Sequence, residues 1–129
     1  MRILVDTNPL VRSVEHAHPL KRTARIALVR LYQQGHELCV APQNISEFWN
    51  VCIRPAERNG LGNTVVATDR LVSRIENFFS VLPDSTTTYR AWRRLVVTHD
   101  VKGAKVHDAK LVATMQVYRI TAILTFQWS

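Results

Sequence analysis

The N-terminal segment of the chain has the apolar pattern of a strand that is buried on both faces of a sheet. Residues 2–5 read Arg-Ile-Leu-Val without polar alternation, and Asp6 follows where such a strand would leave the sheet. In open α/β sheets, ligands bind beyond the carboxyl ends of the strands. Asp6 is therefore either part of a ligand site or, together with Asn8, the cap of a helix that begins at Pro9.

The rest of the chain switches between helical stripes and short apolar runs. Apolar residues at spacings of three and four predict helices over residues 20–34, 42–53, 64–80, 87–98 and 107–119. Short apolar runs predict strands over residues 37–41, 81–82 and 121–126. This order predicts a mainly parallel sheet with helices on both faces, with the strands near Ile3, Leu38 and Ile123 at its centre.

The length and composition indicate one domain with a substantial core. The chain has 129 residues, of which 47% are apolar, and this composition is typical of a globular protein. It has no apolar run of about 18 residues and no signal-peptide pattern, so we expect a cytoplasmic protein with no membrane partner. The two cysteines, Cys39 and Cys52, are predicted to be buried free thiols in a reducing compartment.

The charge of the chain indicates a polyanionic partner. Seventeen basic residues, most of them arginines, outnumber ten acidic ones and give a net charge of +7. Guanidinium groups pair with phosphates and stack on bases, so this excess favours a nucleic-acid partner. An acidic partner protein would explain the charge equally well.

Three of the acidic residues lie in apolar surroundings, namely Asp6, Glu47 and Asp108. Each one alone is typical of a helix cap or a hydrogen-bonded residue at the edge of the core. If the fold gathers them at one sheet edge, however, two carboxylates about 4 Å apart repel by roughly 4 kcal/mol at an effective dielectric constant of about 20. A hard divalent cation removes this cost, and oxygen-only ligands favour Mg²⁺ or Mn²⁺.

The order and spacing of four short motifs resemble a PIN domain, specifically the VapC-type toxin ribonucleases of toxin–antitoxin pairs. The resemblance covers essentially the whole chain. The motifs are Val5-Asp6-Thr7-Asn8, Ser46-Glu47-Phe48-Trp49, Val106-His107-Asp108-Ala109 and Ile123-Leu124-Thr125-Phe126.

This resemblance implies a three-layer α/β/α fold with a mainly parallel central sheet and Mg²⁺-dependent cleavage of RNA. It also implies a homodimer that is inhibited by a cognate antitoxin protein. By position, Asp6 and Asp108 would be metal ligands, and Glu47 would be a further ligand or would help to activate the attacking water. Thr7, Asn8 and Thr125 would support these carboxylates or contact the substrate.

The chain departs from the family pattern at its C-terminus. Family members usually carry an asparagine after the Leu-Thr-Phe run and a fourth acidic residue a few positions later. Here Gln127 takes the asparagine position and the sequence stops at Ser129, so we expect a single PIN domain over residues 1–129 that is truncated at its C-terminus. A second metal position and full activity depend on the missing carboxylate, and the last strand becomes an open edge for a dimer partner or antitoxin to cover.

Two other functions fit parts of the sequence. A chain that has lost activity with its short C-terminus would keep antitoxin binding and serve as a binding module. A different Mg²⁺-dependent phosphohydrolase is a further alternative, but Asp-Thr-Asn at residues 6–8 lacks the second aspartate that an aspartyl-phosphate enzyme places two residues on.

Overall fold

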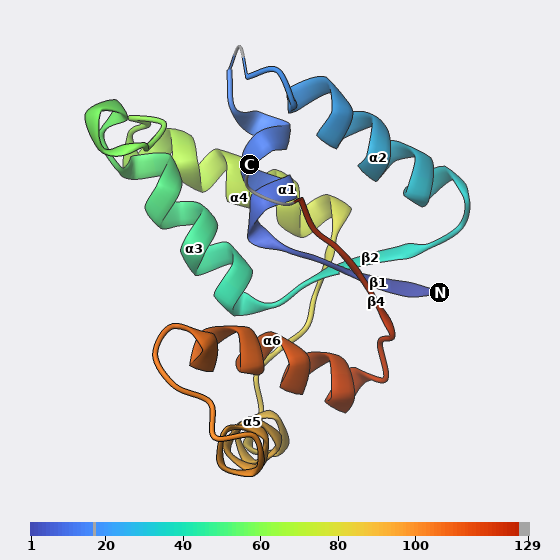
Figure 1. The fold of residues 1–129 in the computed structure, drawn as a ribbon. Helices are drawn as coiled ribbons and strands as arrows, with labels where there is room; N and C mark the ends of the chain where they lie inside the picture. Colours follow the sequence, from blue (N-terminus) through green and yellow to red (C-terminus); the bar gives the residue numbers. More distant parts are fainter. Residues whose placement is uncertain (17, 127–129) are drawn as a thin grey trace.

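The structure, a computed structural model, describes residues 1–16 and 18–126 and has a four-stranded parallel sheet with helices on both sides (Figure 1). The expectation for Gln127 lies outside these residues. In chain order the elements are β1 (Arg2–Val5), α1 (Thr7–Val14), α2 (Lys21–Gln33), β2 (Glu37–Val40), α3 (Pro42–Ile53), the 3-10 turn η1 (Ala56–Arg58), α4 (Val65–Phe78), β3 (Ser80–Val81), α5 (Thr86–Thr98), α6 (Lys105–Tyr118) and β4 (Ala122–Leu124).

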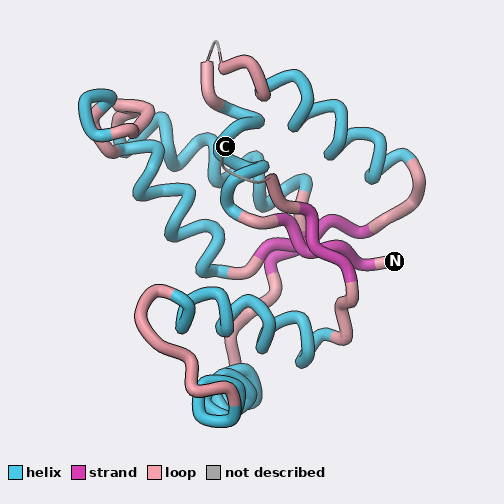
Figure 2. The backbone as a smooth tube through the Cα atoms, in the orientation of Figure 1, coloured by secondary structure: helices cyan, strands magenta, loops and turns pink. Residues whose placement is uncertain are grey.

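The strands lie in the order β3-β2-β1-β4, and all neighbours are parallel. Figure 2 shows the strands grouped in magenta between the cyan helices. Ile3 pairs with Leu38 on one side and with Ala122 on the other. The predicted parallel sheet is therefore confirmed, but the strand near Ile123 is an edge strand rather than a central one. Ile123 is 41% exposed, which is the expected consequence of this edge position.

The two central strands send alternate side chains into two separate cores. Ile3 and Val5 pack with residues of α1, α2, α3 and α4, whereas Leu4 packs with residues of α6 on the other face. Successive side chains of a strand point to opposite faces, so an unbroken apolar run is what two covered faces require. α5 lies against α6 on the side away from the sheet (Figure 1).

Single residues explain where α1 and α3 begin. α3 covers the predicted range from Pro42 to Ile53, because a proline fits the first turn and needs no N–H partner there. α1 begins at Thr7, two residues before the predicted start at Pro9. Pro9 is the third residue of α1, where a backbone N–H would have no partner within the helix, so the missing N–H of proline costs nothing there; Asp6 is the N-cap.

The C-terminal elements differ from the predicted ranges. α6 begins at Lys105 rather than at His107, so the turn after α5 is shorter than expected. β4 spans only Ala122–Leu124, because the pairing with β1 ends at Leu124. Thr125 and Phe126 do not pair with β1. The Thr125 hydroxyl contacts Asp6 and the Phe126 backbone oxygen contacts Asn8, both at the start of α1.

Both cysteines are free and buried, as the sequence predicted. Burial, followed by the neighbouring Glu37 carboxylate, raises the pKa of the Cys39 thiol from 9.0 to about 11, and burial raises the pKa of Cys52 to about 11. Among the described residues, no helix has the length and apolar character that crossing a bilayer requires.

The native protein should resist thiol alkylation. At about pH 8, roughly one thiol in a thousand is ionised when its pKa is near 11, and only the thiolate is nucleophilic. We expect Cys39 and Cys52 to stay unmodified by iodoacetamide in buffer and both to react in denaturant, as counted by intact-mass spectrometry. Rapid labelling of either residue in the native protein would contradict this placement.

Candidate active site

Asp6 ends β1 and opens α1, so its carboxylate serves as a helix cap at the carboxyl edge of the sheet. Oδ1 accepts a hydrogen bond from the Thr7 N–H at 2.8 Å, which is the capping interaction. Oδ2 accepts one from Thr125 Oγ1 at 3.1 Å, just beyond β4. The two interpretations of Asp6 that the sequence left open are compatible, because the cap occupies only part of the carboxylate.

Thr7 connects Asp6 to Glu47, which lies on α3. Thr7 Oγ1 donates to Glu47 Oε2 at 2.7 Å, while the Thr7 amide is bound to Asp6. Glu47 is exposed to solvent, although its neighbours in the sequence are largely apolar. A single residue thus orients two of the three candidate carboxylates.

Asn44 is a residue of this site that the sequence analysis did not identify. It is fully buried, and its Oδ1 accepts a hydrogen bond from the Ala41 N–H at 2.9 Å. Its Nδ2 lies 3.3 Å from Thr7 Oγ1 and 3.5 Å from Asp6 Oδ1 as a donor to both. The signal in the sequence was an amide three residues after Ala41, which has no polar side chain to cap α3.

Gln43 was also missed, and it connects α3 to α6. Its Nε2 donates to Glu47 Oε1 at 2.9 Å and to the backbone oxygen of His107 at 3.1 Å. Gln43 and Glu47 are four residues apart, so they lie on the same face of the helix. This bridge holds the first turn of α6 beside Glu47.

The segment after β4 is fastened to the site by backbone and side-chain contacts. The Asp6 N–H donates to the Leu124 oxygen at 2.9 Å, and Asn8 Nδ2 donates to the Phe126 oxygen at 3.1 Å. Asn8 is buried, and its Oδ1 accepts no hydrogen bond within the described residues. Asn8 therefore supports the site by holding the chain at Phe126, next to the Thr125 hydroxyl that reaches Asp6.

Asp108 is not hydrogen-bonded to this group within the described residues. It occupies the first turn of α6, is exposed, and lines a cavity of about 650 Å³ together with His99 and Lys105. Across residues 1–16 and 18–126, Asp108 makes no hydrogen bond or ion pair, and no three His, Cys, Asp or Glu side chains form a group that could hold a metal ion. The structure thus joins Asp6 to Glu47 and leaves Asp108 as a separate carboxylate, next to His107 in the chain.

The oxygen chemistry of Asp6 and Glu47 fits a hard divalent cation. An ionised carboxylate offers about four lone-pair positions. Asp6 accepts three hydrogen bonds, and Glu47 accepts two, all from uncharged donors. Both side chains therefore keep at least one acceptor position, and carboxylate oxygens are the ligand type that Mg²⁺ and Mn²⁺ prefer.

These features define the class of the molecule as a three-layer α/β/α protein with carboxylates at the carboxyl edge of its parallel sheet. The family model described as PIN domain matches residues 3–128. The chain belongs to the PIN domain family. Among curated proteins, none matches this chain.

A solved structure is similar in fold. The crystal structure of the Mycobacterium tuberculosis protein VapC20, described as a sarcin–ricin loop cleaving toxin, has a TM-score of 0.64 to this chain. The two chains are 20% identical, and the match covers 97% of this chain and 89% of that chain. This likeness confirms the three-layer fold over nearly the whole length.

Replacing Asn44 should destabilise the fold as well as the site. In Asn44→Ala, the buried Ala41 N–H loses its side-chain acceptor, which costs about 1–3 kcal/mol in free energy of unfolding. Urea unfolding followed by circular dichroism measures this loss. Asn50→Ala is the matched control, because Asn50 lies exposed on the same helix. Equal stability of the two variants would contradict the role of Asn44.

Proposed function

We propose that this protein is a Mg²⁺-dependent endoribonuclease that hydrolyses RNA phosphodiester bonds as the toxin of a toxin–antitoxin pair. The observation that carries the proposal is the hydrogen-bonded pair of carboxylates, Asp6 and Glu47, that Thr7 holds at the carboxyl edge of the sheet. The PIN domain match and the fold shared with the toxin VapC20 support it. The net charge of +7 supports a polyanionic substrate.

Each of the three carboxylates would have a distinct role in this reaction. Asp6 is oriented by Thr7 and Thr125, and Asp108 stands in the first turn of α6, so these two would hold a Mg²⁺ or Mn²⁺ ion. When bound, such an ion supplies positive charge to the phosphoryl oxygens and lowers the pKa of its bound water. Glu47 would be a further ligand or would accept the proton of the attacking water at a free lone pair of its carboxylate.

The expected products follow from attack by water at phosphorus. The water oxygen bonds to phosphorus as the bond to the 3′ oxygen breaks, and the leaving 3′ oxygen takes up a proton from solvent. The products are one strand with a 3′-hydroxyl end and one with a 5′-phosphate end. The chain's own contribution is to orient the carboxylates before the substrate arrives, which is the role of the Thr7, Asn44 and Gln43 hydrogen bonds.

The proposal includes the partners that the family resemblance implies. The protein would form a homodimer in the cytoplasm and would be inhibited by a small antitoxin. The edge strand β4 offers an open side of the sheet within the described residues, as expected for a surface that a second chain covers.

One observation favours an alternative, a PIN-fold binding module without catalytic activity that pairs with an antitoxin. Within the described part of the chain, Asp108 is not joined to Asp6 and Glu47, and no three potential ligand side chains form a group. In this alternative the same fold would bind the antitoxin, while the three carboxylates would hold no metal ion.

Neutralising either proposed metal ligand should abolish cleavage while the fold survives. Asn is a good helix cap, so Asp6→Asn keeps the start of α1 but loses the charge. We expect Asp6→Asn and Asp108→Asn each to cut RNA at least about 100-fold more slowly in Mg²⁺, with unchanged thermal unfolding. Asp69→Asn, at an exposed position of α4, is the control and should cleave normally. If both variants cut as fast as the unmodified chain, the site is assigned wrongly.

Metal binding itself separates the enzyme from the binding module. Calorimetric titration with Mg²⁺ should show binding that Asp6→Asn weakens, and saturating Mg²⁺ should raise the unfolding temperature of the unmodified chain. The cation neutralises carboxylates that repel one another, so both effects have the same cause. Absence of any carboxylate-dependent Mg²⁺ binding would favour the non-catalytic module.

A further inference from the structure

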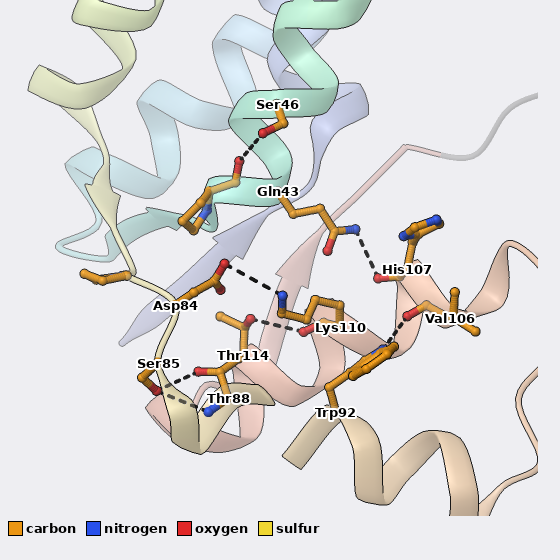
Figure 3. A network of polar contacts seen from close by, with 12 residues as sticks. Gln43, Ser46, Asp84, Ser85, Thr88, Trp92, Val106, His107, Lys110 and Thr114 are labelled. Carbon is orange, nitrogen blue, oxygen red and sulfur yellow. Dashed lines mark hydrogen bonds and ion pairs between the residues drawn. The ribbon is translucent and has the colours of Figure 1, made fainter. Parts of the chain in front are cut away.

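A second cavity adjoins the acidic site where the N-terminal turns of α3 and α6 meet α5 (Figure 3). Its volume is about 420 Å³, within the range of pockets that bind small ligands. We call it the flanking pocket, and its main lining residues are Gln43, Asp84, Tyr89, Trp92, His107 and Lys110.

Two aromatic rings on α5 form one wall of the flanking pocket. Trp92 is held in place because its Nε1 donates to the Val106 oxygen at 2.7 Å. Tyr89 is 52% exposed, and its ring lies 6.1 Å from that of Trp92, centroid to centroid, at an interplanar angle of 39°. An exposed ring beside a fixed indole is a surface on which a planar base can stack.

The polar groups of the pocket include hydrogen-bond acceptors that the protein does not use. Gln43 commits its Nε2 to Glu47 and to the His107 backbone, but within the described residues its Oε1 accepts nothing. Figure 3 shows this oxygen pointing toward Lys110. Within the described part of the chain, the Asp84 carboxylate forms an ion pair with Lys110 alone and keeps free lone pairs.

Lys110 supplies the cationic group of the flanking pocket. Its Nζ lies 3.7 Å from Asp84 Oδ2, and the two side chains are 31% and 48% exposed. An ion pair that is this open to solvent is weak, so the ammonium remains available to a phosphate. Aromatic surface, acceptors and one cation together match a nucleotide better than an apolar ligand or a simple anion.

We propose that the flanking pocket binds one base of a single-stranded RNA, next to the phosphodiester bond that lies at the acidic site. The acceptors Gln43 Oε1 and Asp84 select a base with an exocyclic amino group, because such an amine donates to carboxylate and amide oxygens. The inference rests on the proposed function, and Gln43 is the physical link. The Gln43 Nε2 contacts Glu47 Oε1, while the Gln43 Oε1 faces the pocket.

The stacking wall is tested with tyrosine variants and a short single-stranded RNA of mixed sequence. Binding is measured in the Asp6→Asn background so that the RNA is not cut. Tyr89→Ala should weaken binding about 5- to 100-fold, and Tyr89→Phe should stay within about twofold, because stacking needs the ring and not the hydroxyl. Tyr32→Ala, which removes an exposed tyrosine on α2, is the matched control.

The phosphate contact is tested with two lysines that each pair with an aspartate. Lys110→Gln should reduce the slope of log K against log salt concentration by about 0.7, the value for one contact to a single strand. Lys102→Gln should leave the slope unchanged, since the Lys102–Asp100 pair lies in the turn between α5 and α6. Equal slopes for both variants would count against a phosphate at Lys110.

Base selection and cleavage complete the test. A site-by-site exchange of cytidine for uridine should weaken binding most at one position, and Tyr89→Ala should remove that difference.

With the catalytic residues intact, Tyr89→Ala should raise KM and leave kcat unchanged, as for a group that binds ground state and transition state alike. If the unmodified chain cleaves RNA and Tyr89→Ala does so with the same KM, the flanking pocket does not bind a base, while the proposed nuclease activity is retained. If the unmodified chain neither binds nor cleaves RNA, the proposed function fails with it.

Discussion

The burial of β1 on both faces is the constraint on which the site depends. Ile3 and Val5 fill one core and Leu4 fills the other, so none of these three positions accepts a charged side chain. Arg2 carries its charge at the exposed start of the strand, where it pairs with Glu37. Asp6 is the first position beyond this strand where a carboxylate is tolerated. The start of α1 offers an amide N–H there, and the edge of the sheet leaves the remaining lone pairs open to solvent.

The charge of the site follows from how the protein distributes its cations. Among the described residues, every ion pair involves an acidic residue other than Asp6, Glu47 and Asp108; the pairs are Arg2–Glu37, Arg12–Glu15, His18–Glu15, Lys102–Asp100 and Lys110–Asp84. The hydrogen bonds from Thr7, Gln43 and Thr125 to Asp6 and Glu47 come from uncharged donors and bring no positive charge to these carboxylates. A basic protein thus leaves these carboxylates without an ion-pair partner among the described residues, and under the proposed function a divalent cation would neutralise them before an RNA phosphate approaches.

The sequence predicted those features that depend on local pattern. The range of α3 was predicted because Pro42 marks its start and Arg54-Pro55 its end. β1 was predicted because the run from Ile3 to Val5 is apolar without alternation. The order of the apolar runs placed the last strand at the centre of the sheet, whereas the short C-terminus indicated an open edge. Neither pattern fixes its position, which depends on which strand pairs with β1. Asn44 and Gln43 were not predicted as site residues for a related reason. Their partners lie on α1 and α6, far away in the sequence. The sequence predicts that Asp108 lies in the first turn of its helix. It does not predict how α6 is rotated about its axis, and the direction of the Asp108 side chain depends on that rotation.

The first turns of α3 explain how one helix can serve both chemistry and recognition. Three of its residues reach two neighbouring elements: Asn44 and Glu47 both contact the Thr7 hydroxyl at the start of α1, and Gln43 contacts the start of α6. Gln43 and Glu47 are one helical turn apart, so a base that binds the Gln43 oxygen would bear on the same amide that orients Glu47. Under the proposed function, the base and Glu47 would therefore contact the two amide atoms of one side chain, with no moving loop required.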